Sequence, residues 1–333
     1  MKKVNYYTNK TILVTGGAGS IGSAIVKNLI LSRPASIRIL DNNESGVFDF
    51  TRALSSPLIS PLIGDIRDEK RIATAMRDVD VVFHAAALKH VPLSEYNPIE
   101  AIHTNILGTQ NVITSAIQTG VKKVINISTD KAVHPVNVMG ATKLVAERLI
   151  TNAHHYLGKK KSPVFCSVRF GNVLHSSGSV LPIFEEQIQR GGPVTITSKE
   201  MTRFFMKISD AADFIVKAGI LAKGREIFIP KMPALRIDDL ANALIENVTL
   251  RHGKNAPKIR KKIIGIRPGE KLYESLITSE EAMFVHENNS MFILRYPLSH
   301  IKAINVTPRE NYNSMNARLL DKNQIKKILS QVA

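Results

Sequence analysis

Short apolar runs rich in β-branched residues alternate with longer amphipathic stretches through residues 11–170. Runs that are apolar at nearly every position predict strands buried on both faces, and the amphipathic stretches between them predict helices. The expected strands are 11–16, 37–41, 61–66, 79–86, 122–128 and 163–170, and the expected helices are 20–32, 44–54, 69–77, 97–120 and 140–157. The pattern predicts an α/β fold, a Rossmann-like doubly wound parallel sheet with helices on both faces.

The pattern changes after residue 172. Shorter, mixed elements follow, at 179–197, 209–221, 236–248 and 270–277. We therefore expect a Rossmann domain over residues 1–175 and a smaller C-terminal lobe over residues 176–333, with some segments of the lobe returning to the first domain.

Composition limits the setting and the partners. No apolar run approaches the roughly 18 residues that span a bilayer, and no apolar signal core precedes the first glycines, so we expect a cytoplasmic protein without an integral membrane segment. The single cysteine, Cys166, lies in an apolar run and predicts a buried thiol.

Charge invites a nucleic-acid interpretation, because 45 Lys and Arg against 28 Asp and Glu leave a net charge of +17. The basic clusters at 158–161 and 254–262 are not interleaved with aromatic residues, and the chain has no Trp. Stacking on single strands is therefore not expected. We rank a solvated surface first, attraction to an anionic ligand or an acidic membrane surface second, and expect no nucleic-acid partner.

A glycine-rich turn stands between the first expected strand and helix. Gly16, Gly19 and Gly22 have the spacing G-x-x-G-x-x-G, and Ser20 and Ile21 open the helix. Such a turn lets a pyrophosphate approach the backbone at the positive end of the helix dipole. Asp41 ends the second strand, where a carboxylate accepts hydrogen bonds from a ribose diol and repels a 2′-phosphate. The region predicts NAD(P) binding with NAD favoured; the alternative is a structural turn with Asp41 as a helix cap.

The next two strand ends extend this expected cofactor site. Asp65 and Ile66 follow the third strand, where an adenine amino group can be met. Small residues end the fourth strand and let a cofactor lie against the backbone: Ala85, Ala86 and Ala87. His84 and His90 lack further ligands at matched spacing, so we expect no metal site.

Residues 125–143 resemble the active site of short-chain dehydrogenases/reductases: a strand ending in Ser-Thr, a loop, and a helix carrying Lys143. That superfamily has a tyrosine acid/base four residues before the lysine, where this chain has Met139, whose thioether moves no proton. Thr129, Asp130 and Lys131 leave the fifth strand together and supply proton-carrying groups. On these residues alone, a helix-capping turn with a surface Asp130–Lys131 pair is an equal alternative.

Six longer blocks resemble the nucleotide-sugar 4,6-dehydratases of polysaccharide biosynthesis, within the extended short-chain dehydrogenases/reductases. They are TGGAGSIGS, HAAALKHVPLSEYNPIEAIHTNILGTQNV, STDKAVHPVNVMGATK, VRFGNVLHSSGSVLPIFEEQIQRGGPVTIT, MTRFFM and RPGEKLYESL. The resemblance covers residues 8–280 and implies a lyase that acts on a UDP-sugar, with UDP-N-acetylglucosamine first. NAD or NADP would be held tightly and recycled. Part of that family also carries methionine at the position of Met139.

The resemblance implies a role for each matching residue. Thr129 or Asp130 takes the C4 hydroxyl proton, Lys131 takes the C5 proton if its pKa is lowered, and protonated Asp130 helps the C6 hydroxyl leave. Lys143 binds the nicotinamide ribose. Substrate or cofactor contacts are carried over for Lys89, His90, Asn105, Asn172, Arg203, Arg267, Lys271 and Glu270. Asn105 has a structural alternative, holding its loop through backbone contacts, and Glu270 has another, capping a helix that begins there; Arg169 is expected to be structural.

Two rival functions are also compatible with the sequence. A nucleotide-sugar epimerase shares the cofactor fold, but Met139 and the Asp130–Lys131 pair disfavour it. A non-catalytic cofactor-binding sensor is favoured by Met139 and disfavoured by Lys143 and the proton-carrying residues. The long helices at 97–120 and 140–157 resemble those through which relatives pair, so we expect a homo-oligomer.

Overall fold

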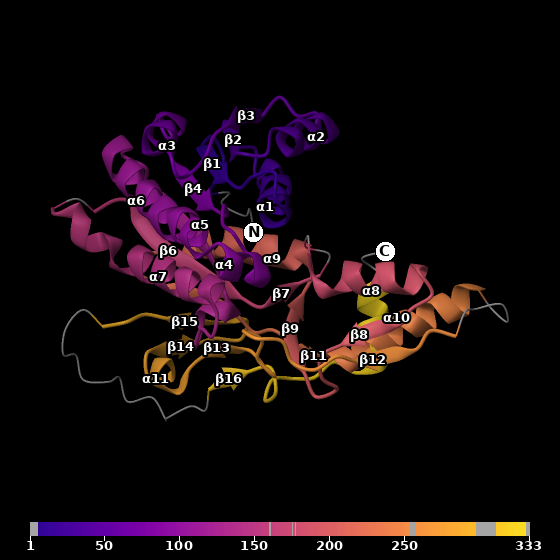
Figure 1. Ribbon diagram of the computed structural model, residues 1–333. Helices are drawn as coiled ribbons and strands as arrows, with labels where there is room; N and C mark the ends of the chain where they lie inside the picture. The colour runs from indigo at the N-terminus through magenta and orange to yellow at the C-terminus, as the bar shows by residue number, and fades with distance from the viewer. Residues whose placement is uncertain are drawn as a thin grey trace.

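The computed structural model describes residues 6–159, 161–174, 176, 178–252, 258–297 and 311–330. Its centre is a nine-stranded sheet in the order β14-β15-β10-β6-β5-β4-β1-β2-β3 (Figure 1). The strands are β1 (Thr11–Thr15), β2 (Ser36–Asp41), β3 (Ile59–Ile63), β4 (Val81–His84), β5 (Lys123–Thr129), β6 (Val164–Phe170), β10 (Ile227–Pro230), β14 (Val285–Glu287) and β15 (Met291–Leu294). Pairing is parallel from β3 across to β10, and β15 and β14 join by antiparallel pairs. The expected doubly wound parallel sheet is confirmed.

Apolar residues at successive strand positions bury both faces of this sheet. Ile12 and Val14 pack in one core cluster with Ile25, whereas Leu13, between them, packs in a second cluster with Ile72. The first face is covered by α1 (Ser20–Ile30), α2 (Glu44–Leu54) and α9 (Ile208–Leu221), and the second by α3 (Glu69–Ala75), α6 (Gly108–Thr119) and α7 (Val138–Asn152). This layering brings the C-terminal ends of β1 to β6 to one open edge.

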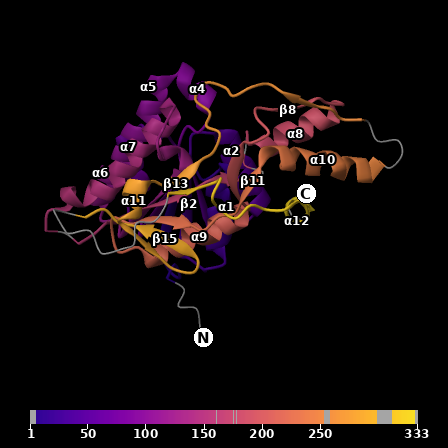
Figure 2. The same cartoon turned by 90° about the horizontal axis from the view of Figure 1, so that it is seen from below.

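A smaller lobe lies beyond the sheet, on the side away from α6 and α7 (Figures 1 and 2). It contains β7 (Asn172–Val173), β9 (Thr202–Met206) and β11 (Ala234–Arg236) in one sheet and β8 (Val194–Ile196) with β12 (Lys261–Ile263) in another. Its helices are α8 (Val180–Gln189), α10 (Ile237–His252) and α12 (Lys322–Ser330), around a third core cluster. Three strands that follow residue 176, β10, β14 and β15, lie in the main sheet. The division at 175/176 stays a prediction.

A last pair of strands, β13 (Ser275–Ile277) with β16 (Tyr312–Asn313), lies beside the short helix α11 (Ser279–Ala282). The expectation that a helix begins at Glu270 is wrong. Gly269 has a φ of +78°, which turns the chain, and the backbone N–H of Thr202 donates to the carbonyl of Leu272. The segment is therefore held as a loop that leads into β13.

The long helix expected at 97–120 is interrupted. It consists of α5 (Pro98–Ala101), a π-helical turn (Ile102–Leu107) and α6, and α4 (Val91–Tyr96) precedes it unpredicted. The widened turn occurs where Asn105 is buried and hydrogen-bonded to the backbone of Leu88. The helix thus departs from regular α-helical geometry at the residue that makes this contact. The helix expected at 140–157 is α7, which ends in a 3₁₀ turn (Ala153–Leu157).

Candidate active site

A cavity of about 640 Å³ runs along the C-terminal edge of the parallel strands. Its walls come from the turn after β1 and the ends of β2, β3 and β4. Sequence-predicted residues that line it are Gly16, Gly19, Ser20, Ile21, Gly22, Asp41, Asp65, Ile66, Ala85, Ala86, Ala87, Lys89 and His90. The structure thus brings the strand-end residues of the first domain to one wall.

The glycine turn has no room for side chains. Gly16 has a φ of +65°, and a Cβ there would lie 2.6 Å from the backbone nitrogen of Ala86. A Cβ on Gly22 would lie 2.1 Å from the carbonyl oxygen of Gly16. At the N-terminus of α1, Gly19 offers no side-chain cap and the first turn has no acidic residue. The turn therefore leaves the positive dipole end of α1 uncovered by any side chain of the glycines, which fits a dinucleotide diphosphate.

The two aspartates at the adenosine end are already held in place. Asp41 accepts hydrogen bonds from the backbone nitrogens of Ala18 and Asn43, both at 3.1 Å, so the carboxylate faces the glycine turn. Asp65 lies two residues beyond β3 and accepts from the backbone and guanidinium of Arg67. Burial raises the pKa of Asp65, but these hydrogen bonds and the Arg67 charge outweigh it and lower the pKa. Both groups therefore offer fixed acceptors.

Asn105 has the structural role that was one of its two expectations. Its side chain accepts from the backbone nitrogen of Leu88 at 2.8 Å and donates to the carbonyl of the same residue at 2.9 Å. It also donates to the hydroxyl of Thr142 on α7 at 2.9 Å. Asn105 therefore fixes the loop after β4 against the helix that carries Lys143, and lines the cavity only through that loop.

Thr129, Asp130 and Lys131 meet around one carboxylate at the end of β5. Asp130 is fully buried, and its Oδ1 accepts from Thr129 Oγ1 and from Lys131 Nζ, each at 2.9 Å. Its Oδ2 is buried and has no hydrogen-bond partner among the described residues. The alternative of a surface pair is wrong. The cluster contains an acceptor, a hydroxyl and an ammonium group, which is a set able to move protons.

Lys131 does not have the lowered pKa that its assigned role required. Burial lowers the pKa of this ammonium group, but the charges of Asp130 and Glu274 outweigh burial and raise it. That role depended on a neighbouring charge and partial burial lowering the pKa, and the condition is not met here because the neighbouring Asp130 and Glu274 carry negative charge. Lys131 therefore carries a proton in the ligand-free protein.

Met139 and Lys143 lie one turn apart on α7. Met139 is 3% exposed and contributes packing. The ammonium group of Lys143 donates to the carbonyl of Ile127 at 2.5 Å. Burial lowers the pKa of Lys143 to about 8, against an opposing effect of Glu147. This places a lysine of reduced proton affinity beside the end of β5.

Residues of the second lobe also approach the C-terminal edge of the parallel strands, and some of their polar groups are already bonded within the protein. The guanidinium of Arg203 donates to the carbonyls of Thr202, Lys271 and Leu272, so in this structure it orders backbone. Arg267 is exposed, and its Nη1 lies 3.9 Å from the carboxylate of Glu270. The Glu270 side chain accepts from the backbone nitrogen of Arg267, which replaces the helix cap once expected for it.

Two further predicted positions differ in their surroundings. Asn172 has a buried Oδ1 without a hydrogen-bond partner among the described residues. The ring of His90 packs against Gly178, where a Cβ would lie 2.4 Å from His90 Cε1. His90 therefore connects the cavity wall to the second lobe.

Sequence reasoning missed Glu274. This carboxylate is 4% exposed, and its Oε1 lies 3.9 Å from Lys131 Nζ and 4.0 Å from Arg203 Nε. Its Oε2 lies 3.6 Å from Lys271 Nζ. Lys131 and Arg203, from distant parts of the chain, and the neighbouring Lys271 thus surround one acidic side chain. Glu274 lies within the block RPGEKLYESL, but that block gave no reason to single it out.

The remaining candidates are structural. His84 is buried between the hydroxyls of Thr15 and Thr109, and burial together with the charge of Lys143 lowers its pKa to about 3. Cys166 is buried, as expected. In the part of the chain that the structure describes, no cluster of His, Cys, Asp or Glu is suited to a metal ion. The basic stretch 254–262 lies partly outside the described residues.

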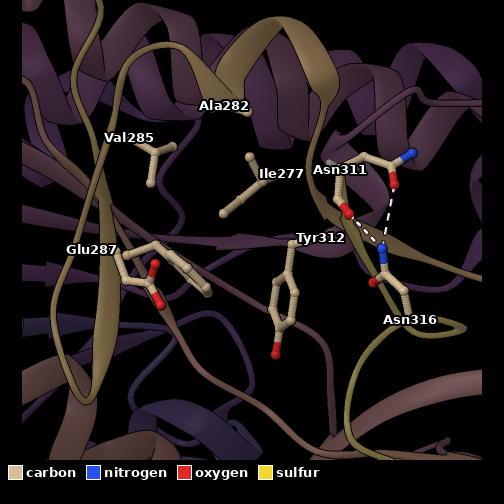
Figure 3. A pocket seen from close by; sticks show the side chains of 8 residues that line it. Ile277, Ala282, Val285, Glu287, Asn311, Tyr312 and Asn316 are labelled. Carbon is tan, nitrogen blue, oxygen red and sulfur yellow. Dashed lines mark hydrogen bonds between the residues drawn. The ribbon is translucent and has the colours of Figure 1, made fainter. Parts of the chain in front are cut away.

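A second cavity, of about 250 Å³, lies between α11 and the strands around it (Figure 3). Apolar side chains such as Ile277 and Val285 face Tyr312 across it, and Asn316 donates to the carbonyl of Asn311 at its rim. None of the predicted site residues lines this cavity. The larger cleft is therefore the candidate cofactor site, and Thr129, Asp130 and Lys131 are not among the residues that line it.

Comparison with known proteins identifies the family. The family model described as "Polysaccharide biosynthesis protein" matches residues 12–296. The chain belongs to this family. A UDP-N-acetylglucosamine 4,6-dehydratase (inverting) of Campylobacter jejuni is 42% identical over 93% of this chain and 88% of its own. A UDP-glucose 4-epimerase of Rickettsia akari is 41% identical over 97% and 96%.

Two further similarities concern the whole length of this family member. An uncharacterized membrane protein of Methanocaldococcus jannaschii is 54% identical, covering 99% of this chain and 98% of its own. The crystal structure of Pen from Bacillus thuringiensis superimposes with a TM-score of 0.91 at 41% identity, covering 98% of each chain. Within the described residues, no helix is both long and apolar enough to span a bilayer.

Proposed function

We propose that this protein is a nucleotide-sugar 4,6-dehydratase acting on UDP-N-acetylglucosamine, a lyase that yields a UDP-4-keto-6-deoxy sugar for surface polysaccharide or glycan synthesis. The observation that carries the proposal is the buried Asp130, joined to Thr129 and Lys131, at the strand edge where Met139 replaces a proton-carrying residue. Elimination of water needs an acid and a base side by side, and this pair supplies both. The Campylobacter relative's name supports the same substrate.

NAD(P) fits the first-domain wall of the cleft, and when bound it supplies hydride acceptance at C4 and hydride donation at C6. The turn at Gly16–Gly22 would hold the diphosphate, and Lys143 the nicotinamide ribose. The fixed carboxylate of Asp41 favours a free ribose diol over a 2′-phosphate, so we propose NAD as the preferred form.

Asp130 is suited to receive the C4 hydroxyl proton, directly or through Thr129. Its buried Oδ2 lacks a hydrogen-bond partner among the described residues, and Thr129 Oγ1 already donates to Oδ1. Gly171 keeps the approach open, since a Cβ there would lie 3.1 Å from that Oδ2. The first proton transfer would leave Asp130 neutral.

Neutral Asp130 changes Lys131. The charge that contributes most to raising the pKa of Lys131 is then gone, and burial favours loss of its proton. The Lys131 side chain is 25% exposed, so the proton can pass to water. Lys131 then takes the C5 proton, Asp130 gives its proton to the departing C6 oxygen, and Lys131 returns a proton to C5. Regaining one proton from water restores the starting pair.

The second lobe would hold the sugar nucleotide. Exposed Arg267 and the neighbouring Lys271 are suited to a diphosphate, and Glu270 to the uridine ribose. Arg203 would contribute by releasing one of its carbonyl contacts or by ordering the loop that carries Lys271. Asn172, Lys89 and His90 would line the sugar end.

We further propose a homo-oligomer that works in the cytoplasm. Apolar side chains on α4 to α7 are exposed in the single chain: Leu93, Tyr96, Ile99, Leu107 and Val145. A row of this kind on adjacent helices supports pairing of two copies through these helices.

Proton NMR in deuterated water, with UDP-N-acetylglucosamine and a trace of NAD, tests the proposed activity. A new 6-methyl signal with deuterium at C5 is expected, and the ring couplings will report retention or inversion at C5. Folded protein that binds the sugar nucleotide and leaves its spectrum unchanged would contradict the proposal.

An epimerase is the second candidate, because relatives such as the Rickettsia protein carry that name. The same spectra separate the two, since an epimerase gives a C4 epimer and no methyl signal. A cofactor-binding sensor would give neither product, nor any transient absorbance of reduced nicotinamide.

A further inference from the structure

Glu274 comes from the loop before β13, yet it lies beside the proton-transfer pair at the end of β5. Its Oε1 is 3.9 Å from Lys131 Nζ, and Lys131 Nζ is 2.9 Å from Asp130 Oδ1. The ammonium group is therefore held between carboxylates from two distant segments. Neither carboxylate is accessible to bulk solvent, because Asp130 is fully buried and Glu274 is 4% exposed.

The position of Glu274 is fixed by contacts that do not involve its charge. Its backbone nitrogen donates to Ser314 Oγ at 3.1 Å, and Ser314 Oγ is hydrogen-bonded to Thr202 Oγ1 at 2.8 Å. Two residues earlier, the carbonyl of Leu272 accepts from Arg203. The loop is also tied to the first domain, because Lys271 Nζ donates to the carbonyl of Val133 at 2.7 Å.

We propose that Glu274 is a positioning residue of the dehydratase, which holds the Lys131 ammonium group beside Asp130 and delays its proton release until substrate has neutralised Asp130. The proposal rests on the function proposed above and adds a residue to it. Glu274 is assigned no contact with substrate or cofactor in the proposed mechanism; it acts through Lys131.

The charges around the pair allow this role. Lys131 faces Asp130 and Glu274 as anions and Arg203 and Lys89 as cations. Glu274 faces Lys131, Arg203 and Lys271. When Asp130 is neutral, Glu274 is the carboxylate that still attracts the Lys131 proton, so it sets the pH at which Lys131 becomes a base.

The test removes that charge in two settings. Glu274→Gln keeps the shape of the side chain, and Glu274→Asp keeps its charge. Glu280→Gln is the matched control, because Glu280 on α11 is exposed. Asp130→Asn imitates neutral Asp130. The titration of Lys131 is followed by NMR of ¹³C-labelled lysine, and its signal is assigned as the one that is lost in Lys131→Arg. Two proteins are compared: Asp130→Asn alone, and Asp130→Asn combined with Glu274→Gln. This measurement needs no turnover.

The Glu274→Gln change should lower the Lys131 midpoint by about one pH unit, as expected for loss of a charge near 4 Å in a partly screened site. The acidic limb of the pH profile for C5 deuterium exchange should move the same way in Glu274→Gln. It should return towards the wild-type position in Glu274→Asp and stay unchanged in Glu280→Gln.

An unshifted Lys131 midpoint with an unshifted exchange profile, in protein that melts like wild type, would overturn the role of Glu274. A shifted midpoint in a protein whose wild type makes no dehydrated product would support the electrostatic role and reject the function on which it rests. If Glu274→Gln does not fold, Glu274→Asp decides. The shorter side chain of Asp lies farther from Lys131, so its attraction to the ammonium group should be weaker. The acidic limb of the exchange profile should then move part of the way, and no movement would overturn the role of Glu274.

Discussion

Arg169 on β6 is a buried cation that joins the main sheet to the segment containing β13 and α11. Its guanidinium is fully buried and is paired with Glu147 on α7 and with Glu281 on α11, at 2.5 and 2.7 Å. It also donates to the carbonyl of Leu276 at 2.9 Å. Arg169→Met removes the charge, nearly preserves the volume, and leaves two buried carboxylates without their cation.

The cost can be worked from Glu281. Burial raises the pKa of Glu281, but Arg169 outweighs burial and lowers it to about 2 from an ordinary value of 4.5. A difference of about 2.5 units corresponds to about 3 kcal/mol. Breaking a buried ion pair from one side costs about 3–5 kcal/mol in other proteins. We therefore expect Arg169→Met to lose about 3–5 kcal/mol of stability at pH 7.

The pH dependence gives the prediction its sign. In the wild type the pKa of Glu281 is lower in the folded state, so its contribution is complete above about pH 5 and is lost as the pH falls towards 2. In Arg169→Met, burial raises the pKa of Glu281 against only the hydrogen bonds from Tyr296 and the backbone of Thr278. The variant should therefore gain stability as the pH falls from 7 to 4, and the gap to the wild type should narrow.

Urea unfolding followed by far-UV circular dichroism at pH 4, 5, 6 and 7 measures this gap, since the chain has no Trp for fluorescence. Arg190→Met is the matched control, because Arg190 is exposed and pairs only along its own helix with Glu186. It should cost less than about 1 kcal/mol. A gap for Arg169→Met of the same small size, or one that stays constant from pH 7 to 4, would refute the reasoning.

Three further changes test the site. Lys131→Ala should abolish C5 deuterium exchange while nucleotide binding by calorimetry survives, and unchanged exchange would remove Lys131 as the base. Gly22→Ala should abolish NAD binding, because its Cβ would lie 2.1 Å from the carbonyl oxygen of Gly16. Binding is measured by titrating the cofactor and following fluorescence, and a curve that matches the wild type would show that the turn rearranges. Met139→Tyr should fold and bind cofactor, since the resembled family carries both residues; loss of folding would reveal a packing role for this buried side chain.

The sheet could be predicted because its signal is repeated at every strand. β1 is apolar on both faces, so it is expected to be buried whichever face its side chains are assigned to. The interrupted helix could not be predicted in the same way. Its π-helical turn depends on the contact between Asn105 and Leu88, which are 17 positions apart, and hydrophobic periodicity does not report such a contact.

The same distinction applies to the site. Strand-end residues such as Asp41, Asp65 and Asp130 could be placed together because parallel strands end at one edge. The proton affinity of Lys131 could not be predicted, because one of the two carboxylates beside its ammonium group, Glu274, comes from another lobe. Arg203 shows the reverse case, since its sequence context predicted a substrate contact and its donors are directed to backbone carbonyls.

Met139 and Glu274 together explain how a site of this kind works without the tyrosine. A tyrosine on α7 would carry its own proton, whereas Met139 only packs, so protons must be held at the end of β5. Asp130 has one oxygen bonded to Thr129 and Lys131, and the proposed mechanism assigns its other oxygen, Oδ2, to the substrate proton. A lysine beside an ionised aspartate is a poor base, and it becomes a better one only after the aspartate accepts a proton. The order of the proposed proton transfers therefore follows from the charges, and in this proposal Glu274, 3.9 Å from Lys131 Nζ, sets how strongly that order is enforced.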